Sequence, residues 1–176
     1  MDNIFKYQEI ENSIFEHYKS GGGKTFYLGF PNLAKHYSIM EGSRTDWTGY
    51  PGSGKTELLL ECLVNTSEWY GHKHLIHMPD AGTVEEVIGK LIHKMSGKQF
   101  EEFYFDSDGN KRLIENRVTE DELEHYLPIV LEYFKILDPE KSNNSKALTP
   151  KEFWQFAVDN QKDLGIFSAV IDSWNY

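Results

Sequence analysis

The chain has 176 residues, 39% of them hydrophobic, which is enough for one domain with its own core. Its net charge is −10, and with only three arginines it lacks the clustered cations that a general nucleic-acid binder needs. No apolar run approaches the roughly 20 residues that cross a membrane, and the single cysteine, Cys62, excludes a disulfide framework and suits a reducing cytosol.

The N-terminal segment indicates a helix followed by a hinge. Apolar residues recur at near-helical spacing over residues 1–19, with charged residues between them, which predicts an amphipathic helix. Residues 21–23 are three glycines and predict a flexible joint. We therefore expect residues 1–23 to be a linker helix with its hinge and residues 24–176 to be the folded core. The helix packs either on its own domain or on a neighbouring copy.

The next stretch has the spacing G-x-x-x-x-G-K-T, which is the Walker A or P-loop pattern. Its residues are Gly49, Tyr50, Pro51, Gly52, Ser53, Gly54, Lys55 and Thr56. The glycines let successive backbone N–H groups point into one concavity, and the helix that follows adds the positive end of its dipole. In this motif the lysine reaches the β- and γ-phosphates and the threonine hydroxyl ligates Mg²⁺. The stretch therefore predicts a site for ATP and Mg²⁺, with Lys55 in a catalytic role and Thr56 on the metal.

The residues on either side of this loop fit a phosphate site. β-Branched and aromatic residues over 44–48 predict a strand before the loop. The leucine-rich segment after the loop predicts a buried helix, with Glu57 on its polar, solvent-exposed face. A loop between a strand and a helix is the setting that phosphate binding requires.

Beyond this helix, further helices and strands alternate. Three capping boxes, each a threonine followed three residues later by a glutamate, predict three helix starts, and Pro128 is expected to kink or divide the second helix. The boxes lie at residues 83–86, 119–122 and 149–152, and short apolar runs predict strands at 74–78, 133–137 and 166–171. Turn residues at 106–110 suggest the tip of a β-hairpin. This alternation predicts an α/β fold with a mainly parallel sheet flanked by helices.

Two aspartates follow predicted strands, at the sheet edge where open α/β folds bind ligands. Asp172 comes after the last apolar run and is the candidate Walker B ligand for Mg²⁺; the alternative is a helix cap or a turn residue. Asp80 comes after the strand at 74–78 and is the candidate catalytic group that orients or deprotonates water; the alternative is a solvated turn acid.

Three stretches carry a family resemblance. They are T-D-W-T-G-Y-P-G-S-G-K-T-E (45–57), Pro79-Asp80, and Ala169-Val170-Ile171-Asp172-Ser173-Trp174-Asn175. With them, the chain resembles the RecA-like ATPase domain of replicative hexameric DNA helicases of the DnaB and Twinkle type, particularly phage-like members, over roughly residues 25–176.

This resemblance implies a P-loop NTPase fold, with Lys55 and Thr56 as the Walker A pair and Asp172 as the Walker B acid. Asp80 stands where the family has a glutamate, one methylene longer. The resemblance also implies a hydrolase that uses ATP and Mg²⁺ in DNA replication. Its members form hexameric rings on single-stranded DNA, in the cytoplasm of a bacterium or a phage-infected cell, without a membrane.

The chain ends four residues past Asp172, so the family's phosphate sensor, DNA-binding loops and arginine finger have no counterpart in it. We therefore expect the front half of a motor core, incomplete at its C-terminus. Two rival interpretations stay open. One is a nucleotide-binding module without catalysis, either a remnant or a regulatory subunit that joins intact rings. The other is a different RecA-like ATPase, such as a recombinase.

Overall fold

Three short parallel strands form the sheet of the computed structural model, which describes residues 7–138 and 148–172. The strand order is β6-β3-β7, with β3 (His74–His77) in the middle, β6 (Phe134–Ile136) on one side and β7 (Ser168–Ile171) on the other. The register places Ile76 between Ile136 and Val170. The α/β fold and the three strands predicted around this sheet are confirmed.

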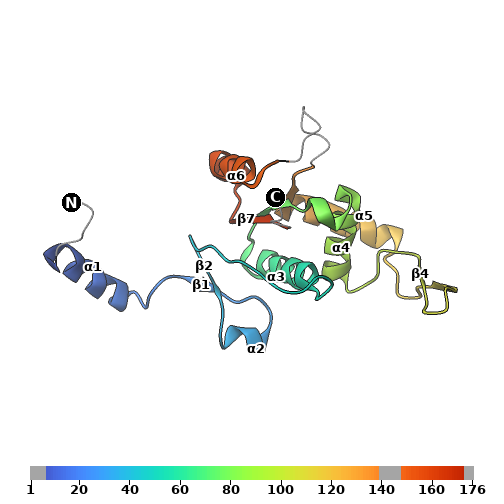
Figure 1. The fold of residues 1–176 in the computed structure, drawn as a ribbon, viewed down its shortest axis with the longest axis horizontal. Helices are drawn as coiled ribbons and strands as arrows, with labels where there is room; N and C mark the ends of the chain where they lie inside the picture. Colours follow the sequence, from blue (N-terminus) through green and yellow to red (C-terminus); the bar gives the residue numbers. More distant parts are fainter. Residues whose placement is uncertain (1–6, 139–147, 173–176) are drawn as a thin grey trace. The chain divides into compact units, whose positions relative to one another are not determined.

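Helices cover both faces of the sheet. Neighbouring residues on β3 point to opposite faces, and apolar residues on each face pack against helices. Ile76 joins a core with buried residues of α3 (Lys55–Tyr70), α4 (Val84–Ser96) and α5 (Glu120–Tyr133). Leu75 packs instead with Phe153 and Ala157 of α6 (Pro150–Leu164). Figure 1 shows α6 on one side of the strands and α3 with α4 on the other.

The three predicted capping boxes are present at the starts of α4, α5 and α6. In each, the threonine side chain accepts from the backbone N–H three residues on, and the glutamate side chain there accepts from the threonine N–H. α5 runs through Pro128 as one helix, so the division considered for it does not occur.

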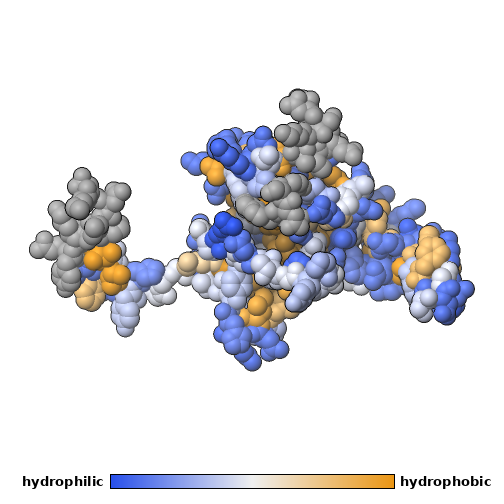
Figure 2. All heavy atoms as spheres, viewed as in Figure 1, coloured by the Kyte–Doolittle hydropathy of each residue, from blue (hydrophilic) through white to orange (hydrophobic). Residues whose placement is uncertain are grey.

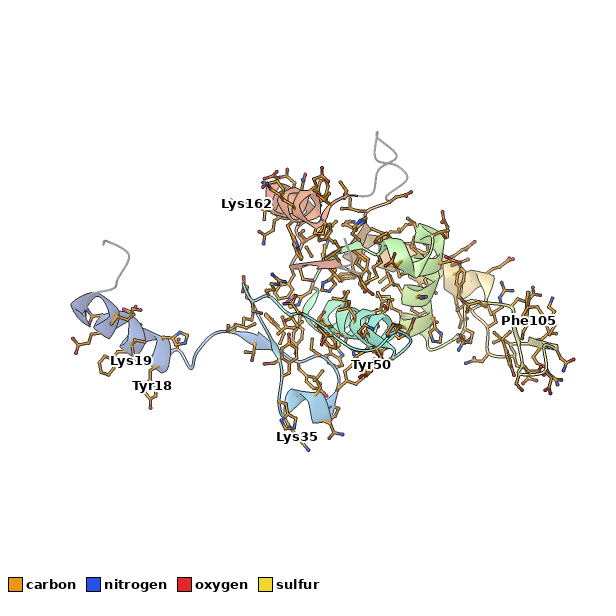
Figure 3. All side chains as sticks on the ribbon, in the orientation of Figure 1. Tyr18, Lys19, Lys35, Tyr50, Phe105 and Lys162 are labelled. Carbon is orange, nitrogen blue, oxygen red and sulfur yellow. The ribbon has the colours of Figure 1, made fainter. Side chains whose placement is uncertain are left out.

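A β-hairpin extends from residues 103 to 113 and confirms the predicted turn. β4 (Phe103–Phe105) pairs antiparallel with β5 (Lys111–Leu113), and the Asp106 carboxylate accepts from the Asn110 backbone N–H at 2.9 Å and from the Arg112 guanidinium at 2.8 Å. Phe105 is exposed on the hairpin, where apolar atoms lie at the surface (Figures 2 and 3).

The chain divides into two compact units, residues 1–47 and 48–176. The first contains α1 (Tyr7–Lys19), α2 (Pro31–Ala34) and the antiparallel pair β1 (Thr25–Phe26) and β2 (Ile39–Met40). α1 confirms the predicted helix over the residues described, and residues 1–6 lie outside them. The division expected between residues 23 and 24 stays a prediction. Among the helices described, none is both long and apolar enough to cross a membrane.

Candidate functional site

Residues 49–54 form a tight turn that leads directly into α3. Gly52 and Gly54 have φ angles of 73° and 82°, a conformation that residues with side chains rarely adopt. The Ser53 N–H donates to the Tyr50 carbonyl at 3.2 Å, and Tyr50 itself is exposed beside α3 (Figure 3). The glycines thus provide the backbone curl that a phosphate-binding loop needs.

The start of α3 differs from the starts of α4, α5 and α6. Those three helices have threonine capping boxes, whereas α3 begins after Gly54, with no side chain of the described residues capping its first turn. The N–H groups of a first turn have no partner inside the helix and carry the positive end of its dipole. They are therefore suited to an anionic ligand such as a phosphate.

Lys55 folds back over the loop. Its ammonium donates to the Gly49 carbonyl at 3.0 Å and to the Tyr50 carbonyl at 2.9 Å. The cation of the motif is therefore held on the loop by two backbone oxygens, which a phosphate group would have to replace.

The strand predicted over residues 44–48 is wrong, because these residues form no ladder with any described strand. Their side chains make local contacts instead. Arg44 pairs with Asp46 at 3.0 Å, and Tyr37 makes a hydrogen bond to Thr45 and an edge-to-face contact with Trp47. A segment of strand-like composition forms a strand only where it can pair with another strand, and residues 44–48 make local contacts instead.

Asp172 lies at the C-terminal end of β7, next to the start of α3. Its backbone N–H donates to the His77 carbonyl at 3.0 Å, which extends the pairing of β3 and β7 by one bond. Its carboxylate accepts from the Thr56 hydroxyl at 2.5 Å. The structure thus brings together the two residues that the sequence assigned to Mg²⁺. Ser173, Trp174 and Asn175, part of the family resemblance, lie outside the described residues.

Asp80 lies in a short 3₁₀ turn, η1 (Pro79–Ala81), between β3 and α4. Together with Thr56, Ala81, Lys90 and Asp172 it lines a cleft of about 190 Å³. The turn brings Asp80 to the cleft that Thr56 and Asp172 also line. A position beside a cleft suits both a group that orients water and a turn acid, so both interpretations of Asp80 stay open.

Sequence reasoning missed Lys90, the cation among the residues that line this cleft. Lys90 and Lys94 on α4 face Glu57 and Glu61 on α3, with Lys90 at 3.5 Å and Lys94 at 2.9 Å from Glu57. The two glutamates on α3 are four residues apart, as are the two lysines on α4. This matching spacing was the sequence signal for ion pairs between the two helices. Burial alone would raise the pKa of Glu57, but the hydrogen bond and charge of Lys94, with help from Lys90, bring it below its usual value.

A larger cavity of about 460 Å³ lies beside the hairpin. Its lining residues are Gln99, Tyr104, Leu113, Ile114 and Glu115. They include no residue of the P-loop and neither aspartate, so the smaller cleft at the end of β7 is the better candidate site.

Comparison of the chain with family models, with curated proteins and with solved structures gave no match. The suitability of the site for a nucleotide is therefore judged on its own groups. Thr56 and Asp172 supply the oxygen ligands that Mg²⁺ prefers, and Gly52, Gly54 and Lys55 supply a cationic cradle for phosphates. These residues fit Mg-ATP.

Proposed function

We propose that this chain binds ATP with Mg²⁺ and hydrolyses it as the ATPase core of a replicative DNA helicase. On this proposal the fold is that of a RecA-like P-loop NTPase, and the chain works in the cytoplasm of a bacterium or a phage-infected cell. Single-stranded DNA and a ring of six copies belong to the proposal through the family resemblance alone.

One observation carries the nucleotide part of this proposal: the hydrogen bond between Thr56 and Asp172. A glycine-rich turn that matched the P-loop pattern by chance would have no reason to lie against the carboxylate that ends a distant strand. The pairing of β7 with β3 and the packing of α3 on the same sheet produce this contact.

Each residue of the site has a task that follows from its position. The N–H groups of residues 52–56 and the Lys55 ammonium bind phosphate oxygens, and Thr56 with Asp172 holds Mg²⁺. The bound Mg²⁺ would supply positive charge that neutralises the phosphates. Asp80 orients the attacking water and accepts its proton. Because aspartate is shorter than the glutamate of the resembled family, we expect slow turnover.

Nucleotide binding tests the proposal directly. Calorimetric titration with Mg-ATP should give a lower affinity for Lys55→Ala than for the wild type, by at least about tenfold, because a charged hydrogen-bond donor is lost. Lys73→Ala is the matched control, since Lys73 pairs with Glu132 and lies outside the cleft. Equal binding by the wild type and Lys55→Ala would refute the proposal.

A second candidate function is nucleotide binding without turnover. It is favoured by the lining of the cleft, where the one cation among the described lining residues is Lys90 and none is an arginine. Arginine is the residue that commonly stabilises the charge that develops during phosphoryl transfer. Retained Mg-ATP binding with no phosphate release, with or without single-stranded DNA, would favour this function over the motor.

A further inference from the structure

Lys90 lines the same cleft as Thr56 of the P-loop. The cleft is bounded by the first turn of α3 with Thr56, by η1 with Asp80, by the end of β7 with Asp172, and by α4 with Lys90. α3 and α4 pack against each other through the core, which fixes Lys90 relative to the loop (Figure 1).

The charges around the cleft leave a role for a cation in addition to Lys55 and a bound Mg²⁺. Asp80 and Asp172 are both acidic, and a triphosphate would add further negative charge at the same place. Lys55 would approach a bound phosphate from the loop, because the Gly49 and Tyr50 carbonyls hold its ammonium there before binding. Lys90 is the cation among the described residues that line the cleft, so it is the side chain on the α4 side that could contact a phosphate there.

Lys90 can take this role because its ion-pair partner has another cation. Lys94 contacts Glu57 at 2.9 Å and Glu61 at 3.6 Å, and its side chain is only 8% exposed. Lys90 contacts Glu57 at 3.5 Å with a side chain that is 35% exposed. If Lys90 turned towards the cleft, Glu57 would keep its contact with Lys94, whose single charge it shares with Glu61. A long, flexible, partly solvated ammonium can make such a turn at small cost.

We propose that Lys90 binds the terminal phosphate of the nucleotide and so distinguishes a nucleoside triphosphate from a diphosphate. This inference rests on the proposed function, because it needs a nucleotide on residues 49–56. It adds a phosphate contact from α4, within the same chain, to the contacts of the P-loop. The competing role for Lys90 is a purely structural salt bridge between α3 and α4.

The test compares Lys90→Gln with the wild type in binding to Mg²⁺ with a non-hydrolysable ATP analogue and to Mg-ADP. Lys90→Gln should bind the triphosphate about tenfold more weakly, since one charged contact is lost, and should bind ADP within about twofold of the wild type. Lys90→Arg, which keeps the charge, should recover most of the triphosphate affinity.

Lys98→Gln is the matched control, because Lys98 is similarly exposed, at 33%, and pairs with Glu122 away from the cleft. It should change neither affinity. ADP binding by Lys90→Gln also reports that this variant is folded.

Two outcomes overturn the inference, and they differ in what they say of the proposed function. If Lys90→Gln binds both nucleotides as the wild type does, or loses both equally, while Lys55→Ala binds Mg-ATP more weakly than the wild type, Lys90 has no phosphate-sensing role and the nucleotide site stands. If the wild type itself fails to bind Mg-ATP, or binds it no better than Lys55→Ala, the proposed function fails and the inference fails with it.

Discussion

His74 is a buried, neutral group, and the protein should lose stability in mild acid because His74 takes up a proton when the chain unfolds. Its ring, 1% exposed on β3, lies 3.2 Å from the Thr66 hydroxyl of α3 and 2.8 Å from the Ser168 hydroxyl of β7. The Thr66 hydroxyl already donates to the Leu63 carbonyl at 3.0 Å, so Nε2 of His74 donates to Thr66 and Nδ1 accepts from Ser168. A neutral imidazole thus joins the helix that begins with Lys55 to the strand that precedes Asp172.

The size of the effect follows from the pKa. Burial, with a smaller contribution from the nearby His72, lowers the pKa of His74 from 6.5 to about 3. Because the unfolded chain binds this proton more tightly than the folded chain, stability is lost as the pH falls from about 6.5 towards the folded pKa. The protonated fraction of His74 in the unfolded state, integrated from about pH 8 to about pH 5, is about 1.5 pH units. At 1.36 kcal/mol per unit, this lowers the free energy of unfolding by about 2 kcal/mol.

Urea unfolding at these two pH values, followed by far-ultraviolet circular dichroism, measures this loss. The comparison protein is His74→Gln, whose amide can still form hydrogen bonds but does not titrate. The carboxylates of Glu57, Asp106 and Glu122 have pKa values below their usual range, and these groups affect both proteins alike. The raised pKa of Glu68 affects both proteins alike.

The wild type should therefore lose about 2 kcal/mol more than His74→Gln between about pH 8 and about pH 5. The same pH dependence in both proteins would show that His74 is protonated in the folded state or is not buried as described, and would refute the reasoning.

Two further substitutions probe the metal position and the turn that carries Asp80. Asp172→Asn keeps the shape of the side chain but removes its charge, so the gain in ATP affinity on adding Mg²⁺ should fall by at least about tenfold. Titrations with and without Mg²⁺ measure this gain, Asp163→Asn on the exposed side of α6 is the control, and an unchanged response to Mg²⁺ would contradict the assignment. Gly82 has φ 107°, and a Cβ there would lie 1.9 Å from the Glu86 carboxylate of the α4 capping box, so Gly82→Ala should lower the free energy of unfolding by about 2 kcal/mol. Gly71→Ala, also at positive φ but with open space around it, should cost less in the same urea unfolding assay, and equal losses would argue against the clash.

The elements that could be predicted from sequence are those with local causes. A capping box needs only a threonine and a glutamate three residues later, so each of the three starts of this kind could be located from a few residues. The three strands of the sheet are short apolar runs, and their parallel pairing follows from the helices between them. The contact between Thr56 and Asp172 could be expected only from the Walker motifs, because the two residues are far apart in the sequence.

The sequence prediction failed for residues 44–48 and missed Lys90 for the same physical reason. In both cases the outcome depends on another element of the fold, which the local sequence pattern does not contain. Residues 44–48 have the composition of a strand, but a strand exists only where a neighbouring strand can pair with it. Lys90 has the position of a solvated lysine, and only the packing of α4 on α3 places it at the cleft. Glu57 was correctly expected on the polar face, but that face is also the one that meets the lysines of α4.

Because residues 44–48 form no strand, the two ends of the P-loop are held by different contacts. Leu60, Leu63 and Val64 anchor α3 in the core, so the position of Thr56 against Asp172 depends on helix packing rather than on residues 44–48. The upstream half of the loop has a different tie, the Lys55 ammonium on the Gly49 and Tyr50 carbonyls. Phosphate binding would transfer Lys55 from these carbonyls to phosphate oxygens. The affinity of the loop for phosphate then depends on the difference between these two sets of acceptors. When phosphate binds, the Gly49 and Tyr50 carbonyls lose their hydrogen bonds from Lys55.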